Sequence, residues 1–276
     1  MKNQLFILLF FVSKIVLSQT FELPSEELIK KFKIKSINSF LCKNSLCDTA
    51  EIFLQWEFDK FGNIVLEMLG DETDTSYLEL YFYDSNQKLI TKKKLGDFIC
   101  HKELKSIDTT LINYYYNEDG YLKSEIIKGG CCDIEIIYEY INNLLVKKTY
   151  NNSGCRYYGY IGEILLSYNQ NGLIEIEKNN LYNSHRKYTY NEQGKMDSIL
   201  VRTDQNNKIY AFEIFRYENN LIVEEIKYGH DFENNSPKEK GISNKYYYDE
   251  NNLLTEISEE KDNKVISRLI YKYEYY

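Results

Sequence analysis

The sequence predicts an all-β protein in which tandem antiparallel β-hairpin repeats form a long curved or spiralled sheet, preceded by a short N-terminal helix. Three observations predict this fold. Apolar and polar residues alternate from Glu51 onward, polar turns rich in Gly and Asn recur, and an aromatic residue precedes each turn. Alternation with a period of two is typical of strands that bury one face. The 276 residues are ample for a buried core.

The first segment, residues 1–18, is predicted to be a signal peptide. Its apolar run Leu5–Val12 follows a cationic start, and Val16 and Ser18 suit a cleavage site. Lys14 interrupts the apolar stretch, which is then shorter than the roughly 20 residues that span a bilayer. We therefore predict an exported protein, in the periplasm, on the outer surface or secreted, with no membrane span after cleavage. An uncleaved anchor or a buried N-terminal element is the alternative.

Residues 19–50 are predicted to cap the first repeat. Ser25 precedes Glu26 and Glu27, so a helix that begins here has a capping side chain and two acids near the positive end of its dipole. The spacing of Leu28 and Phe32 supports about two helical turns. An array of repeats needs its terminal apolar face covered, and this helix is predicted to cover it.

The repeat domain is predicted to span residues 51–276. Each hairpin has an aromatic anchor at the end of its first strand, and the anchors are Phe58, Tyr83, Tyr116, Tyr140, Tyr168, Tyr190, Tyr217 and Tyr248. Two residues before the anchors stand seven aromatic residues and one leucine, and an aliphatic residue follows each turn. A bias in codon usage can enrich these residue types, but it does not place them at fixed positions relative to each turn. We interpret it as cross-strand pairing of aromatic and aliphatic side chains on one face of the sheet.

The turns have consistent chemistry. Glycine occupies a position that needs positive φ in four of them, at Gly62, Gly120, Gly172 and Gly194. Asparagine, which tolerates the left-handed region best after glycine, replaces it in three others, at Asn142-Asn143, Asn219-Asn220 and Asn251-Asn252. The same kind of turn is therefore predicted throughout the domain.

These repeats resemble the YD repeat of RHS-type proteins. Tyr116–Leu122 and Tyr190–Met196 match best, with a tyrosine, an asparagine, a glycine that ends the turn and an aliphatic residue two positions later. The resemblance covers Glu51 to Tyr276 and implies hairpins joined edge to edge. Large members of that family enclose a toxin domain and cleave it free, whereas eight repeats without a cargo domain do not suit that role. The resemblance also suggests carbohydrate binding.

Six cysteines in an exported chain favour structural disulfides over reactive thiols. The predicted disulfide residues are Cys42, Cys47, Cys100, Cys131, Cys132 and Cys155. Cys42 and Cys47 are close enough to staple one loop, and the other pairings stay open. Zinc bound through Cys100 and His101 is an alternative that matches no paired C-x-x-C spacing. The acidic stretch Gly70–Ser76 lacks the spacing of a calcium loop, so no metal site and no cofactor are predicted.

The charge and the motifs exclude several functions. A net charge of −8 at pH 7 repels phosphate backbones, so nucleic acid is not expected as a partner. The three histidines, His101, His185 and His230, are scattered, and no nucleophile motif, phosphate loop or H-E-x-x-H motif occurs. We predict a non-enzymatic binding or structural module at the bacterial cell envelope, with a glycan or an envelope protein as its partner.

Tyrosine triplets point to a candidate binding face. In Tyr114–Tyr116 the middle residue points away from the anchor face. The candidate aromatic binding face consists of Phe82, Tyr115, Tyr121 and Tyr247, because such rings bind glycans and proteins well. A second buried face is the alternative, since flat exposed aromatic sheets aggregate.

Two other functions compete with this prediction. One is an immunity or accessory component of an RHS-like toxin system, in which the sheet holds a partner. The other is an outer-membrane β-barrel, which the alternation in Leu269–Tyr275 suggests. Charges on the second face, such as Lys123 and Glu125 or Glu175 and Glu177, count against a lipid-facing band, where a midplane Lys or Arg costs about 2–4 kcal/mol.

Overall fold

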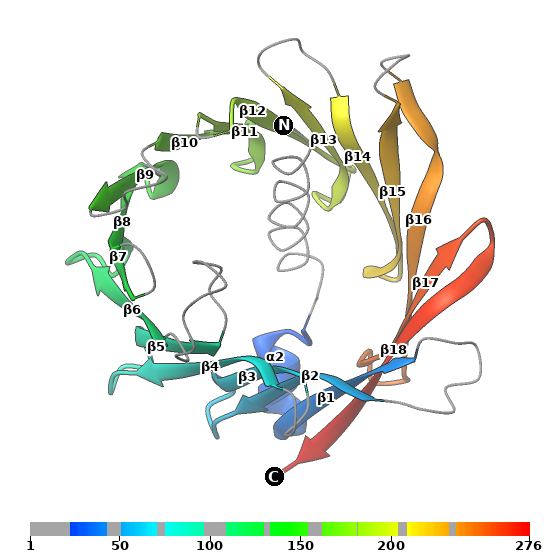
Figure 1. The fold of residues 1–276 in the computed structure, drawn as a ribbon, viewed down its shortest axis with the longest axis horizontal. Coiled ribbons are helices and arrows are strands. Elements are labelled where there is room, and N and C mark those ends of the chain that lie inside the picture. Colours follow the sequence, from blue (N-terminus) through cyan, green and yellow to red (C-terminus); the bar gives the residue numbers. More distant parts are fainter. Residues whose placement is uncertain are drawn as a thin grey trace, which may run out of the picture.

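The computed structural model describes residues 23–42, 51–70, 75–96, 109–129, 133–153, 162–180, 182–203, 209–231 and 236–276. These residues form one closed antiparallel sheet of 18 strands and one short helix (Figure 1). The all-β prediction is confirmed, whereas the open curved or spiralled sheet is wrong. Each described strand pairs with a neighbour on both sides, so the barrel has no unpaired edge.

The elements in chain order are α2 (Glu26–Phe32), β1 (Ile34–Cys42), β2 (Glu51–Phe58), β3 (Ile64–Gly70), β4 (Thr75–Tyr83), β5 (Leu89–Gly96), β6 (Thr109–Tyr116), β7 (Leu122–Lys128), β8 (Asp133–Ile141), β9 (Leu144–Ser153), β10 (Gly162–Tyr168), β11 (Ile174–Asn179), β12 (Ser184–Tyr190), β13 (Met196–Thr203), β14 (Ile209–Glu218), β15 (Leu221–Asp231), β16 (Ser236–Tyr248), β17 (Leu254–Lys261) and β18 (Lys264–Tyr275).

Strand β1 closes the barrel. Its Ile37 lies opposite Tyr273 of β18 on one side and Trp56 of β2 on the other. The sequence predicted only a cap in this region, because the apolar residues of β1 do not alternate. A register shift between Ile34 and Ser36 explains the missing alternation, since a bulge moves the following side chains to the other face. Closure of the barrel therefore depends on β1, whose apolar and polar residues do not alternate.

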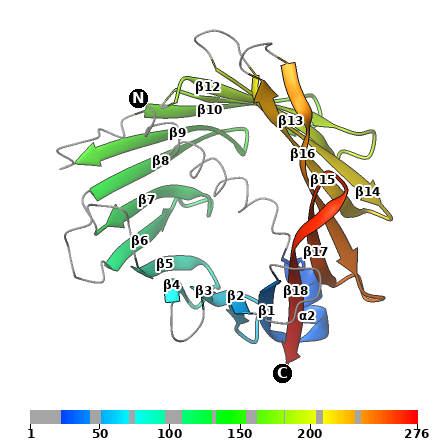
Figure 2. The same ribbon diagram turned by 45° about the vertical axis from the view of Figure 1, so that its right-hand side comes forward.

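The predicted short helix is confirmed as α2. The Ser25 hydroxyl accepts a hydrogen bond of 3.3 Å from the Leu28 amide, and Lys33 ends the helix in the left-handed conformation. Ile29 belongs to the same buried cluster as Trp56 and Phe58, and Figure 2 shows the helix beside β1 and β18. Within the described ranges, no helix has the length and apolar character needed to cross a membrane.

The first residue of each longer turn holds that turn together. Between β2 and β3, the Asp59 carboxylate accepts hydrogen bonds from the Phe61 amide at 2.8 Å and the Asn63 amide at 3.0 Å. The two-residue turns Asn142–Asn143 and Asn219–Asn220 have positive φ at both positions, as tight hairpins require. The predicted turns are confirmed, and an acceptor side chain explains why Asp or Asn follows so many anchors.

Each of the eight anchors lies at a register shift of its hairpin. In five repeats the anchor hydroxyl donates to a backbone carbonyl just past the preceding turn: Tyr83 to Ile64, Tyr116 to Leu89, Tyr168 to Leu145, Tyr190 to Ile174 and Tyr248 to Ile222. These bonds join consecutive hairpins, which explains the recurrence of tyrosine.

The two ends of the barrel differ. The turns after the eight anchors all lie at one end, because the strands are antiparallel and each anchor lies at the end of an even-numbered strand. The helix and the last residue lie at the same end, where the Tyr276 amide donates to the Lys33 carbonyl at 2.9 Å. Three longer stretches of sequence, between β1 and β2, β5 and β6, and β9 and β10, join strands at the opposite end.

The two faces of the sheet also differ. The anchor face carries the buried apolar cluster that includes Trp56, Phe215 and Tyr271, whereas Phe82 and Tyr115 on the other face are 47% exposed. Side chains converge on the concave face of a closed sheet and diverge on the convex one. The anchor face is therefore the interior of the barrel, and the other face is its outer surface.

Candidate functional site

A belt of tyrosine and glutamate side chains lines the interior. In four places the tyrosine two residues before an anchor donates its hydroxyl to a glutamate on the preceding hairpin. The pairs and their distances are Tyr81 to Glu67 at 3.0 Å, Tyr138 to Glu125 at 2.7 Å, Tyr188 to Glu177 at 3.4 Å and Tyr246 to Glu225 at 3.1 Å. We call these eight residues the tyrosine–glutamate belt.

The register explains why the belt recurs. Three of the four belt glutamates stand three residues after the aliphatic residue that follows a turn, as Glu125 follows Leu122, and Glu225 stands four residues after Leu221. The residue directly opposite each glutamate belongs to the same hairpin and is aromatic in three of the four, as Tyr114 is for Glu125, while the next hairpin supplies the hydroxyl, as Tyr138 does. This role of glutamate was not predicted. The nearly constant spacing of the glutamates from the turn is the signal that reveals it.

Cations on β5 neutralise a further interior acid, Glu79 on β4. The Glu79 carboxylate lies 3.1 Å from the Lys92 ammonium and 3.6 Å from that of Lys94, and it accepts a hydrogen bond from Tyr81. Burial alone raises the pKa of Glu79, but Lys92, Tyr81 and Lys94 together outweigh burial and lower it. This acid therefore stays ionised, with its charge fully paired.

A more deeply buried group lies on β14–β16. The Glu225 side chain is fully buried; it accepts hydrogen bonds from Asn244 and Tyr246, and its other oxygen lies 3.3 Å from the Lys227 ammonium. The neighbouring Glu213 is buried as well, and one of its oxygens has no hydrogen-bond partner among the described residues. Burial, reinforced by Glu225, raises the pKa of Glu213 to about 7 despite Lys227.

The interior is divided into two sectors. The buried apolar cluster lies on β12–β18, β1 and β2, together with α2. On β6–β9, by contrast, Tyr114, Glu125, Tyr138 and Lys148 are only half-buried. The half-buried sector combines phenol rings, a carboxylate and an ammonium group, which offer both apolar surface and hydrogen-bonding groups.

The four predicted aromatic residues do not form one contiguous patch. Phe82, Tyr115 and Tyr247 are each about half exposed, at 47%, 47% and 46%. Phe82 on β4 and Tyr115 on β6 are separated by β5, and Tyr247 lies on β16 in a distant part of the barrel. Tyr121 packs against Tyr140, with ring centroids 5.2 Å apart. The four residues therefore do not lie together on one part of the surface.

Of the predicted disulfide residues, the structure describes Cys42, which is fully buried and disulfide-bonded. The other five cysteines, its partner among them, lie outside the described residues, as do His101 and most of the acidic stretch Gly70–Ser76. Among the described residues, no group of three or more His, Cys, Asp or Glu side chains is arranged to hold a metal ion. The pairing of the cysteines stays a prediction.

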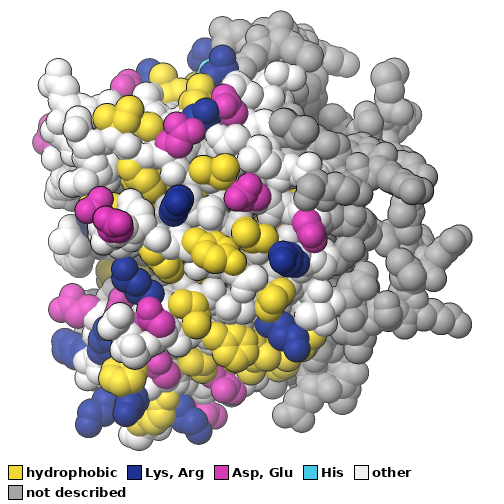
Figure 3. All heavy atoms as spheres, turned by 90° about the vertical axis from the view of Figure 1, so that its left-hand side faces the viewer, with side chains coloured by type: hydrophobic (Ala, Val, Ile, Leu, Met, Phe, Trp, Pro, Cys, Tyr) yellow, Lys and Arg dark blue, Asp and Glu magenta, His cyan; other side chains and the backbone are white. Residues whose placement is uncertain are grey.

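The outer surface carries ion pairs between strands. The Lys147 ammonium lies 3.3 Å from Glu139 and 2.7 Å from Glu163, and the Lys245 ammonium lies 2.8 Å from Glu260. Figure 3 shows basic and acidic side chains interspersed with hydrophobic ones on the side of the barrel that includes β6–β9. Such a mixed surface is typical of a protein face in water.

Two of the predicted charges lie elsewhere than expected. Glu125 and Glu177 were expected on the face opposite the anchors, but both are members of the interior belt. They are therefore no obstacle to a lipid-facing outer surface. The charges that do face outward are others, among them Lys93, Lys147 and Lys245, which alternate with interior residues along β5, β9 and β16.

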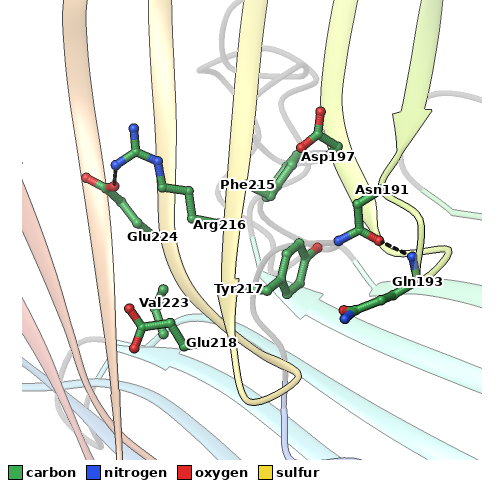
Figure 4. A pocket seen from close by; sticks show the side chains of 9 residues that line it. All are labelled: Asn191, Gln193, Asp197, Phe215, Arg216, Tyr217, Glu218, Val223 and Glu224. Carbon is green, nitrogen blue, oxygen red and sulfur yellow. Dashed lines mark hydrogen bonds and ion pairs between the residues drawn. The ribbon is translucent and has the colours of Figure 1, made fainter.

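Two hollows lie near the short turns. The first has a cavity volume of about 490 Å³. Figure 4 shows that the Arg216–Glu224 ion pair lies on one side of it and Asn191, Asp197 and Tyr217 on the other. The second has a cavity volume of about 580 Å³ and lies between α2 and two turns.

No family model matches the sequence. Among solved structures, the barrel is similar to a porin-like protein from Bacteroides uniformis, with a TM-score of 0.44 and 11% identity over 88% of this chain and 97% of that one. A porin-like protein from Bacteroides vulgatus has a TM-score of 0.34 and 8% identity over 87% and 98%. The TcdB2–TccC3–Cdc42 structure has a TM-score of 0.39 and 11% identity over 81% of this chain and 13% of that one. Likenesses this distant carry no functional conclusion.

Proposed function

We propose that the protein is an exported, non-enzymatic β-barrel of the bacterial cell envelope that binds a glycan through the half-buried part of its tyrosine–glutamate belt. The observation that carries the proposal is the Tyr138–Glu125 hydrogen bond of 2.7 Å, with Tyr114 opposite Glu125. Phenol rings pack against the apolar face of a sugar ring, and carboxylate and phenol oxygens hydrogen-bond its hydroxyl groups. The interior offers both kinds of contact side by side.

Retention on insoluble chitin, cellulose and a purified cell-wall preparation tests this proposal. We expect retention on one of these materials, with at least tenfold weaker binding for Glu125→Gln and for Tyr138→Phe. Tyr247→Phe is the matched control, because it removes an exposed hydroxyl from the outer surface. Absence of retention on all three, or equal retention of the belt variants and the control, contradicts the proposal.

A second candidate is the outer-membrane β-barrel, and the closed architecture favours it over an open binding sheet. Only helices and closed barrels satisfy all backbone hydrogen bonds in lipid. Outer-membrane barrels also have short turns at one end and longer connections at the other, and three longer connections of this barrel share one end. This candidate agrees with the fold better than any function that needs an open sheet.

The outward-facing lysines favour water over lipid as the environment of the barrel. At the midplane of a bilayer, each of Lys93, Lys147 and Lys245 would cost about 2–4 kcal/mol, so we place the barrel in water within the envelope. Carbonate extraction of membranes from a strain that expresses the protein tests this placement. We expect release by carbonate, whereas extraction by detergent alone supports the outer-membrane candidate. An accessory role in a toxin system gains no separate support from the described residues, and neighbouring genes test it.

A further inference from the structure

The hollow between α2 and the first two turns has the composition of a small ligand site. It is lined by Glu26, Lys30, Lys60, Phe61, Asn63 and Gln87. Its volume of about 580 Å³ is within the usual range for small-molecule pockets. The hollow lies at the short-turn end of the barrel and outside the tyrosine–glutamate belt.

One wall of the hollow is fixed by close packing. A Cβ atom at Gly62 would lie 2.9 Å from the Cγ atom of Lys30, so the helix rests directly on the turn. The Lys30 ammonium contacts the Glu26 carboxylate one turn earlier on the helix. Its charge is therefore already paired, and its position is set by the packing.

Lys60 supplies an unpaired charge at the opening. Its ammonium lies 4.9 Å from the centre of the Phe61 ring, and within the described ranges no carboxylate forms an ion pair with it. The Phe61 side chain is 45% exposed, which leaves apolar ring surface for a ligand. A cation beside an exposed ring binds a ligand that has both a carboxylate and an apolar face.

Two amide side chains complete the hollow. The Asn63 amide nitrogen donates to Asp59 at 3.0 Å and to the Gln87 oxygen at 2.7 Å, so its two hydrogens are used and the two turns are tied together. The Asn63 oxygen and the Gln87 nitrogen keep their hydrogen-bonding capacity. They present one acceptor and one donor in fixed positions, which suits a hydroxylated ligand.

We propose that this hollow binds a carboxylated sugar, such as one residue of a uronic-acid oligomer. The carboxylate pairs with Lys60, the apolar face of the sugar ring packs on Phe61, and the hydroxyl groups bond to Asn63 and Gln87. An acidic peptide would satisfy Lys60 but would make less use of the fixed amide pair. This site is separate from the belt and does not rest on glycan binding there.

Isothermal titration with trigalacturonic acid, and with galactotriose as its neutral counterpart, tests the proposal. We expect binding of the acidic trisaccharide alone, at least tenfold weaker after Lys60→Gln or Phe61→Ala and weakened by 0.5 M salt. Lys195→Gln is the matched control, because its ammonium lies 5.0 Å from the Tyr217 ring in an equivalent turn away from this hollow.

Three results overturn the proposal: equal binding of the two trisaccharides, unchanged binding after Lys60→Gln, or binding of an acidic peptide such as tri-glutamate but not of the sugar acid. Because Lys60 and Phe61 are outside the belt, their variants leave retention on insoluble glycans unchanged if the belt binds them. Failure here is therefore distinguishable from failure of the proposed function.

Discussion

The Tyr116 hydroxyl donates a hydrogen bond of 2.7 Å to the backbone carbonyl of Leu89. This bond connects one hairpin to the return strand of the hairpin before it. The register shift at each anchor displaces the ladder beside the turn, and the phenol of the next anchor supplies a donor for the carbonyl there. Tyrosine thus combines an apolar ring for the interior with a donor that phenylalanine lacks.

Loss of this donor is expected to destabilise the barrel. Tyr116→Phe leaves the Leu89 carbonyl without its phenol donor, so the free energy of unfolding should fall by about 1 kcal/mol. Urea denaturation followed by tyrosine fluorescence measures the change. Tyr115→Phe is an adjacent control on the exposed face, and it should have no measurable effect. Equal effects of the two variants would show that the bond contributes nothing.

Glycine is expected to matter most where the helix packs on a turn. Gly62 and Gly172 both have positive φ, at 85° and 75°, so alanine costs each turn about 1–2 kcal/mol. At Gly62 the new Cβ also meets Lys30, whereas nothing lies within 4 Å at Gly172. Gly62→Ala should therefore lower the melting temperature further than Gly172→Ala does. The opposite order in thermal unfolding contradicts the contact with α2.

The buried carboxyl group of Glu213 on β14 predicts that the folded protein loses stability as the pH rises. The folded state holds the pKa of Glu213 at about 7, above the usual value of 4.5, so the folded protein binds more protons between these pH values. Stability should fall as the pH rises from 4.5 to 7 and stay low above it. Glu225, Lys227 and Arg186 are the charged groups that face this carboxyl.

Glu213→Gln removes this dependence. The variant should be more stable than the natural protein at pH 8, on the order of 2–3 kcal/mol, with little difference at pH 4. Glu79→Gln is the control with the opposite sign, because the pKa of Glu79 is lowered and its stabilisation is lost as the pH falls. Denaturant titrations at pH 4, 6 and 8 measure both variants. Parallel profiles for the two variants contradict the assignment.

The buried belt bond is expected to contribute more than the half-buried one. Tyr246 is 5% exposed and its acceptor Glu225 is fully buried, so Tyr246→Phe should cost about 1.5–3 kcal/mol, as expected for a bond to a charged group. Tyr138→Phe should cost less, since water reaches the half-buried Glu125. Unfolding free energies of the two variants test this order. A cost for Tyr138→Phe that equals or exceeds the cost for Tyr246→Phe contradicts it.

The hairpins and their turns are local features, and the sequence predicts them well. The anchor positions, the positive φ at Gly120 and Asn143, and the short helix all follow from neighbouring residues. Each depends on backbone conformation or on alternation within a few positions. Local chemistry therefore accounts for nearly all the elements of the barrel, but not for how they join.

Closure was not predictable, because it depends on pairing between distant segments. Ile37 and Tyr273 meet across the seam, and a bulge in β1 removes the alternation that would have revealed this strand. The belt was missed for a similar reason. Glu125 and Tyr138 look like solvent-facing and core residues respectively until the pairing of neighbouring hairpins places them together.

The seam between β1 and β18 has a consequence for how the barrel is made. During synthesis β1 emerges before β2–β17, yet its partner β18 appears only after them. Until then, β1 and the growing end of the sheet both present unpaired backbone groups, which invite pairing with other chains. An interrupted chain would keep two open edges, so premature termination should yield aggregates rather than a smaller ring.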